Sequence, residues 1–185
     1  MHELILGGGK SGKSRCAEQR AADWLGWPGR TACLIATALP GDDEMRERIS
    51  RHRADRARRV PNLITIEVPT ALADAVKAQS ADHRLLVIDC LTLWLTNLLM
   101  PLQGSPIGDA EWQAREQEFI DALRQARGPV VLVSNEIGMG VSPLGADARR
   151  FVDALGMLHQ CVSSMCSHVT LMVAGNALSV KGRRA

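Results

Sequence analysis

A glycine-rich stretch near the start of the chain has the residue types and spacing that bind phosphate. Residues 7–14 read Gly-Gly-Gly-Lys-Ser-Gly-Lys-Ser, which fits the pattern G-x-x-x-x-G-K-[ST]. In such a loop, backbone N–H groups cradle the phosphates, the lysine reaches the β- and γ-phosphates, and the last hydroxyl ligates Mg²⁺. The stretch predicts a site for ATP or GTP, with Ser14 as a metal ligand, made by Gly7, Gly8, Gly9, Lys10, Ser11, Gly12, Lys13 and Ser14.

The residues on either side of this loop support the same interpretation. The apolar residues 4–6 precede it directly and predict a buried strand, and residues 15–22 are of types that favour a helix. A strand, a loop and a helix in this order form the context in which phosphate-binding loops occur. A glycine-rich turn without a ligand is the alternative, and this context disfavours it.

A carboxylate at the end of a second apolar run is a candidate metal ligand. Residues 85–88 are apolar and lead into Asp89, as expected of a buried strand that ends beside the nucleotide. Asp89 would then hold Mg²⁺, directly or through water. The alternative is an aspartate that caps the helix after the strand.

A third apolar run leads into further polar residues. Residues 130–133 precede Ser134, Asn135 and Glu136, and open α/β sheets bind their ligands at the carboxyl ends of the strands. Glu136 at that edge can orient a substrate hydroxyl or a metal-bound water. A capping role for Asn135 and Glu136 before Gly138 fits the sequence equally well.

Residues 42–59 form a strongly charged segment. Its carboxylates gather at the beginning and its arginines at the end, an arrangement that the helix dipole favours. At a spacing of four residues, Arg48, His52 and Arg56 share one face of the predicted helix. Their guanidinium groups can bind triphosphate oxygens in a bidentate manner. The alternative is a solvated, charged helix whose histidine has no chemical role.

These segments must be positioned by a sheet, and the pattern of the chain predicts one. Apolar strand-like runs alternate with helical patterns, which is typical of an α/β fold with a mostly parallel sheet and helices on both faces. The length of 185 residues and the hydrophobic content of 46% suit one domain over residues 1–185. We expect strands at residues 3–6, 31–36, 63–68, 85–89, 130–134, 169–173 and 178–181. We expect helices at residues 13–25, 43–58, 71–79, 91–99, 109–127 and 146–165.

The composition argues against several classes of protein. A net charge of +2 and few aromatic residues, with Tyr absent, disfavour nucleic-acid binding. The longest apolar run, near residues 91–102, is too short and too interrupted to span a bilayer, and no secretory signal is visible. Five cysteines without a C-x-x-C pair favour reduced thiols. We therefore expect a soluble cytoplasmic protein with no membrane span and no nucleic-acid partner.

A group of histidines and cysteines near the C-terminus lacks the spacing of a zinc site. On a continuous helix, His159 and Cys166 share one stripe, whereas Cys161 and His168 share another. Four ligands on two stripes cannot converge on one ion. We interpret these side chains as packing residues.

The motifs follow one another in an order that resembles a single enzyme family. The phosphate loop is followed by Ile-Ala-Thr-Ala at 35–38, by the charged helix with His52 and Arg53, by Asp-Cys-Leu-Thr-Leu-Trp-Leu at 89–95, and by Ser-Asn-Glu-Ile-Gly-Met-Gly at 134–140. This order resembles the bifunctional adenosylcobinamide kinase / adenosylcobinamide-phosphate guanylyltransferase family of cobalamin biosynthesis. The resemblance covers nearly the whole chain, and the histidine-bearing helix is specific to that family.

The resemblance implies a two-step enzyme with a RecA-like phosphate-loop (P-loop) NTPase fold. It would phosphorylate the aminopropanol hydroxyl of adenosylcobinamide with ATP or GTP, and then transfer GMP from GTP to give adenosylcobinamide-GDP. His52 would be the nucleophile that carries GMP covalently, while Lys13, Arg53, Arg56 and Mg²⁺ stabilise the developing charge. The resemblance also implies a trimer. It places the guanosine site at Thr37, Ala38, Glu67 and Asp89.

The chain departs from the family pattern at some positions, and other functions fit the motifs. Leu63 stands where the family usually has Trp, four residues before Glu67, and His159 stands where it usually has Asn. One alternative is a P-loop kinase of another small alcohol, without a covalent nucleotidyl adduct. Another is a non-catalytic nucleotide-binding module. Nucleotide preference separates these functions, because a guanylyltransferase must discriminate guanine.

Overall fold

The computed structural model describes residues 1–182, except for the side chain of Arg48. Arg48, which we predicted to share a helix face with His52 and Arg56, therefore lies outside the described residues. The strands are β1 (His2–Gly7), β2 (Thr31–Ala36), β3 (Leu63–Glu67), β4 (Arg84–Asp89), β5 (Val130–Val133), β6 (His168–Val173) and β7 (Asn176–Lys181). The helices are α1 (Lys13–Leu25), α2 (Asp43–Arg59), α3 (Leu72–Gln79), α4 (Leu91–Leu99), α5 (Asp109–Arg124) and α6 (Ala146–Met165).

The strands form one sheet in the order β3-β2-β4-β5-β1-β6-β7. Every neighbouring pair is parallel except β6 and β7, which are antiparallel. The central strand β5 reads Val-Val-Leu-Val and is buried at every residue, as expected for a parallel strand covered on both faces. The predicted mostly parallel α/β sheet is therefore confirmed.

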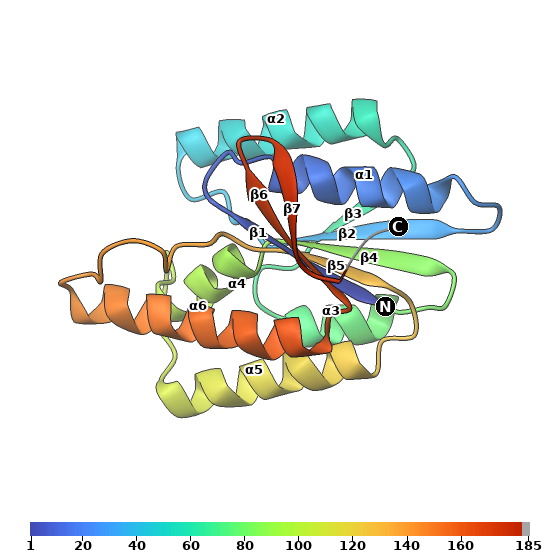
Figure 1. Cartoon of the computed structure of the whole chain (residues 1–185). Helices are drawn as coiled ribbons and strands as arrows, with labels where there is room; N and C mark the ends of the chain where they lie inside the picture. Colours follow the sequence, from blue (N-terminus) through green and yellow to red (C-terminus); the bar gives the residue numbers. More distant parts are fainter. Residues whose placement is uncertain (183–185) are drawn as a thin grey trace.

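Helices cover both faces of this sheet. Helices α1 and α2 lie on one face, whereas α3, α4, α5 and α6 lie on the other (Figure 1). The core beneath the second group includes Trp94, whose ring lies 5.4 Å from that of Trp112 and 5.0 Å from that of Phe119, centroid to centroid. Within residues 1–182, no helix has both the length and the apolar character needed to cross a bilayer.

One predicted helix boundary is wrong, because tertiary contacts end the helix early. The sequence pattern places the end of the fifth helix at residue 127, but α5 ends at Arg124. The Arg127 backbone N–H donates to Ser80 Oγ at 2.8 Å, which draws the chain away from the helix axis. A side chain at Gly128 would collide with the carbonyl oxygens of Ala81 and Arg84, so the backbone approaches that turn closely. All other boundaries lie within two residues of the prediction.

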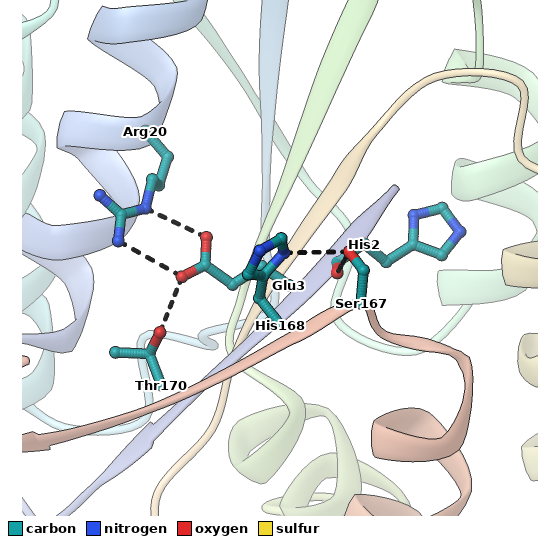
Figure 2. A network of polar contacts seen from close by, with 6 residues as sticks. All are labelled: His2, Glu3, Arg20, Ser167, His168 and Thr170. Carbon is teal, nitrogen blue, oxygen red and sulfur yellow. Dashed lines mark hydrogen bonds and ion pairs between the residues drawn. The ribbon is translucent and has the colours of Figure 1, made fainter. Parts of the chain in front are cut away.

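A buried ion pair ties β1, α1 and β6 together at the end of the sheet where β1 begins. Figure 2 shows the Glu3 carboxylate between Arg20 of α1 and Thr170 of β6. Arg20 Nε donates to Glu3 Oε2 at 3.0 Å, and Thr170 Oγ1 donates to Glu3 Oε1 at 2.9 Å. In the same network, Ser167 Oγ donates to the His2 carbonyl oxygen at 3.1 Å. These contacts hold β1 in register, so that its other end delivers the phosphate loop.

Candidate active site

The phosphate loop joins the end of β1 to the start of α1, and its shape requires glycine at two positions. Gly7 has φ +149° and Gly12 has φ +101°, both in the region that L side chains rarely adopt. A Cβ on Gly7 would also collide with the Met172 carbonyl oxygen and lie 2.7 Å from Ser11 Oγ. A Cβ on Gly9, in contrast, would meet nothing within 4 Å. The first and last glycines therefore set the fold of the loop, and the middle ones leave it open.

The polar atoms of the loop fit a phosphate ligand. Lys13 Nζ donates to the Gly8 carbonyl oxygen at 2.6 Å, so the ammonium group lies over the loop. The Gly175 N–H donates to the Ser11 carbonyl oxygen at 3.0 Å and supports the loop from the β6–β7 turn. Among the described residues, Ser11 Oγ is buried and has no hydrogen-bond partner. An unmade hydrogen bond of this kind costs about 1–3 kcal/mol. A bound polar ligand would recover it.

The predicted metal ligands supply oxygen atoms at the same edge of the sheet. Ser14 lies in the first turn of α1, and Asp89 is the last residue of β4. Burial raises the pKa of the Cys90 thiol to about 12, and the Asp89 charge adds to this rise while Lys13 opposes it. Hydroxyl and carboxylate oxygens suit Mg²⁺, which binds few protein ligands together with substrate phosphates.

Thr37, a predicted guanosine-site residue, is fully buried and bound within the protein. Its Oγ1 donates to the Cys90 carbonyl oxygen at 2.7 Å and accepts from the Cys90 N–H at 2.9 Å. Its N–H donates to the Asp89 carbonyl oxygen at 3.1 Å, and its own carbonyl accepts from Asn97 Nδ2 at 2.8 Å. Thr37 thus fixes the ends of β2 and β4 beside each other and holds the next residue, Ala38, at the edge of the sheet.

Two hollows between α2 and the β2–β3 edge bring together most of the other predicted nucleotide-binding residues. A hollow of about 290 Å³ is lined by Arg53, Arg56 and Glu67, among others. A smaller one of about 150 Å³ is lined by Ala38, Arg53 and Glu67, among others. Arg53 and Glu67 form an ion pair across the region that both hollows share. The structure therefore gathers these four residues around two neighbouring hollows.

Charge, rather than apolar burial, docks α2 on the molecule. Arg59 Nη1 donates to Glu18 Oε2 at 2.7 Å, and the Glu18 side chain on α1 is only 4% exposed. Arg56 is buried beneath α2. Burial lowers the pKa of its guanidinium, and the carboxylates of Glu18 and Asp89 oppose that shift. Arg56 therefore lies in the field of the predicted metal ligand Asp89.

His52 lies exposed on α2, beside Arg53 in sequence and one turn before Arg56. It lines neither of the two hollows described above. Asp42 caps the start of the helix, since its Oδ1 accepts from the Met45 N–H at 2.7 Å, and the predicted helix is confirmed. The structure thus places His52 next to the gathered residues, with its ring facing solvent.

A buried polar group that the sequence reasoning missed lies at the same edge of the sheet. His159 of α6 is buried, and its Nε2 lies 2.7 Å from Ser134 Oγ, directly after β5. Its Nδ1 lies 3.9 Å from Glu136 Oε2. The signal was available, because His159 shares the apolar face of its helix with Leu155 and Val162, and a buried polar side chain requires a partner.

Comparison with known proteins bears on what these residues do. Residues 3–180 match the family model described as cobinamide kinase / cobinamide phosphate guanyltransferase. The chain belongs to this family. The match confirms the predicted family and the pair of activities that its description names.

Relatives of this kinase and guanyltransferase family match the chain over its full length. A Pseudomonas aeruginosa protein named bifunctional adenosylcobalamin biosynthesis protein CobP is 45% identical over 182 residues, which cover 98% of each chain. An Escherichia coli protein named bifunctional adenosylcobalamin biosynthesis protein CobU is 34% identical, with 96% of this chain and 98% of the relative covered. A protein of the same name from Salmonella typhimurium is 33% identical, with the same coverage.

Solved structures with much lower sequence identity share the fold. The flagellar accessory protein FlaH from Methanocaldococcus jannaschii aligns with a TM-score of 0.52 at 13% identity, over 98% of this chain and 78% of FlaH. The ATPase domain of G40P aligns with a TM-score of 0.57 at 12% identity, over 98% of this chain and 77% of that one. These likenesses support the phosphate-loop fold predicted for this kinase and guanyltransferase.

Proposed function

We propose that the chain phosphorylates adenosylcobinamide with ATP or GTP and then transfers GMP to the product through a covalent intermediate on His52. The main support is that α2, which carries His52, also supplies Arg53 and Arg56 to the hollows where Ala38 and Glu67 lie. Family membership supports both steps.

In the kinase step, the substrate hydroxyl attacks the γ-phosphorus. The bond from that phosphorus to the β–γ bridging oxygen breaks, and the nucleoside diphosphate leaves with the electron pair. Lys13 and the N–H groups of the phosphate loop stabilise the charge that develops on the phosphate oxygens. Mg²⁺ held by Ser14 and Asp89 would neutralise part of the same charge.

In the guanylyl-transfer step, a ring nitrogen of His52 attacks the α-phosphorus of GTP. The bond to the α–β bridging oxygen breaks, pyrophosphate leaves, and GMP is joined to His52 by a P–N bond. The phosphate of the first product then attacks the same phosphorus, and the P–N bond breaks to restore the histidine. Arg53 and Arg56 stabilise the phosphate oxygens, because they lie on the same helix within one turn. The guanosine site in this proposal is lined by Ala38, Glu67 and Asp89, and buried Thr37 supports it by holding Ala38 in place.

Labelling tests this intermediate directly. The purified protein is incubated with Mg²⁺ and GTP labelled in the α-phosphate, and protein-bound label is tested for stability in acid and alkali. We expect acid-labile, alkali-stable label on wild type and none on His52→Ala. His83→Ala is the matched control, because His83 is also exposed but lies in the turn between α3 and β4. His52→Ala is expected to retain phosphorylation of adenosylcobinamide.

Two results would contradict the proposal. Label that persists on His52→Ala would assign the nucleophile to another residue. An unlabelled wild type that folds and binds GTP would favour the simpler kinase of an alcohol, without a covalent nucleotidyl adduct.

We also propose a cytoplasmic location and a trimeric assembly. The location is supported by the cysteines, since all five are free thiols in the structure. The trimer rests on the family resemblance, and light scattering of the purified protein tests it.

A further inference from the structure

The carboxylate of Glu136 lies in the part of the active site where the kinase step takes place. Strand β5 lies between β1, which leads into the phosphate loop, and β4, which ends at Asp89. Residues that follow β5 therefore emerge between the loop and the predicted metal ligand. The Glu136 N–H donates to the Gly7 carbonyl oxygen at 3.0 Å, and the Glu136 side chain is 20% exposed. A substrate can reach this carboxylate.

The contacts of this carboxylate leave it able to accept a proton. Its Oε1 accepts from the Gly138 N–H at 2.6 Å, which fixes the orientation of the group. Its Oε2 faces His159 Nδ1 at 3.9 Å. Among the described residues, no lysine or arginine forms an ion pair with Glu136. The charge is therefore not neutralised by a fixed cation of the protein.

A chain of hydrogen bonds behind Glu136 allows His159 to present a proton to this carboxylate. The Asn135 N–H can only donate, and it donates to Thr92 Oγ1 at 2.7 Å. Thr92 can then donate to Ser134 Oγ at 3.0 Å, and Ser134 to His159 Nε2 at 2.7 Å. Burial lowers the pKa of His159, which favours the neutral ring, and the Glu136 charge opposes this shift. A neutral ring that accepts at Nε2 carries its proton on Nδ1, which faces Glu136.

We propose that Glu136 is the general base of the kinase step and that His159 positions it. This proposal rests on the proposed kinase activity. As the substrate oxygen bonds to the γ-phosphorus, its hydroxyl proton passes to the Glu136 carboxylate, and the nucleoside diphosphate leaves. Ser134 holds His159, and His159 directs its Nδ1–H at the Glu136 carboxylate. This contact keeps the carboxylate ionised and orients toward the substrate the oxygen that accepts the proton.

Three substitutions separate this role from a structural one. Glu136→Gln keeps an oxygen that can accept from the Gly138 N–H, but the amide cannot take up the proton. His159→Asn keeps a polar atom at the position of Nδ1, and His159→Gln keeps one at the position of Nε2. For each variant, kcat and KM are measured for phosphorylation of adenosylcobinamide, together with the thermal unfolding midpoint. Labelling of the protein by GTP is the control activity, since it requires the nucleotide but not Glu136.

The proposal predicts different results for the three variants. Glu136→Gln lowers kcat by about 100-fold or more, with little change in KM and with labelling retained. His159→Gln, which still bonds Ser134, lowers kcat by about tenfold through misplacement of the base. His159→Asn, which keeps a donor at the position of Nδ1, restores most of the kcat that His159→Gln loses.

Three results would overturn it. Wild-type kcat in Glu136→Gln would exclude this carboxylate as the base. Loss of kcat in His159→Asn together with full activity in His159→Gln would mean that His159 serves only to satisfy Ser134. A wild type that is labelled by GTP but does not phosphorylate adenosylcobinamide would overturn the kinase half of the proposed function, and the role of Glu136 with it.

Discussion

Replacing Gly7 with alanine tests whether the phosphate loop depends on the absence of a side chain at the end of β1. The residue has φ +149°, which costs a residue with a side chain about 1–3 kcal/mol. The new Cβ would also collide with the backbone carbonyl oxygen of Met172 and lie 2.7 Å from Ser11 Oγ. Overpacking of this kind adds about 1–3 kcal/mol. We therefore expect Gly7→Ala to lower the free energy of unfolding by about 2–6 kcal/mol.

Urea denaturation measures this loss, and Gly9→Ala is the matched control. A Cβ on Gly9 meets nothing within 4 Å, so we expect a change in stability within about 0.5 kcal/mol. Titration with ATP should show weak or no binding by Gly7→Ala, because the loop can no longer close under the phosphates. The reasoning is refuted if Gly7→Ala and Gly9→Ala unfold at the same urea concentration, since β6 would then yield to the new side chain at no cost.

Three further predictions concern other parts of the molecule. Arg20→Met removes the guanidinium that pairs with buried Glu3 and should lower the free energy of unfolding by about 3 kcal/mol; an unchanged urea midpoint would contradict this. Glu18→Gln removes the charge that pairs with Arg59 and should weaken the docking of α2. We expect faster amide hydrogen exchange confined to residues 43–59, and unchanged exchange there would contradict the prediction. Burial lowers the pKa of His159 below its ordinary value of 6.5. As the pH falls, His159 is therefore protonated in the unfolded chain before it is protonated in the folded protein, so the free energy of unfolding decreases below about pH 6.5. His159→Asn should show a shallower fall in urea unfolding between pH 7 and pH 5, and an equal fall would exclude His159 as a source of the pH dependence.

Local patterns in the sequence predict most of the elements of this fold. Apolar runs such as residues 130–133 identify buried strands, because a strand covered on both faces has no polar alternation. The glycine-rich loop and the charge gradient of residues 42–59 identify the starts of α1 and α2. The order of the strands, and therefore the neighbours of each, depends on contacts distant in sequence, and no local pattern contains that information.

The same limit explains what was missed in the site. His159 was interpreted as a packing residue, because nothing near it in sequence indicates Ser134 or Glu136 as partners. Those partners follow β5, and only the packing of α6 on the sheet brings them within reach. Thr37 was predicted from the family resemblance, but its buried contacts with the ends of β2 and β4 are visible only in the structure.

The sheet lies between the two helices that carry His52 and His159. Helix α2 lies on one face and α6 on the other (Figure 1). Substitutions that repack one face leave the side chains on the opposite face in place, because the strands lie between them. Natural selection can therefore alter the residues around His159 while the helix that carries His52 is inherited unchanged.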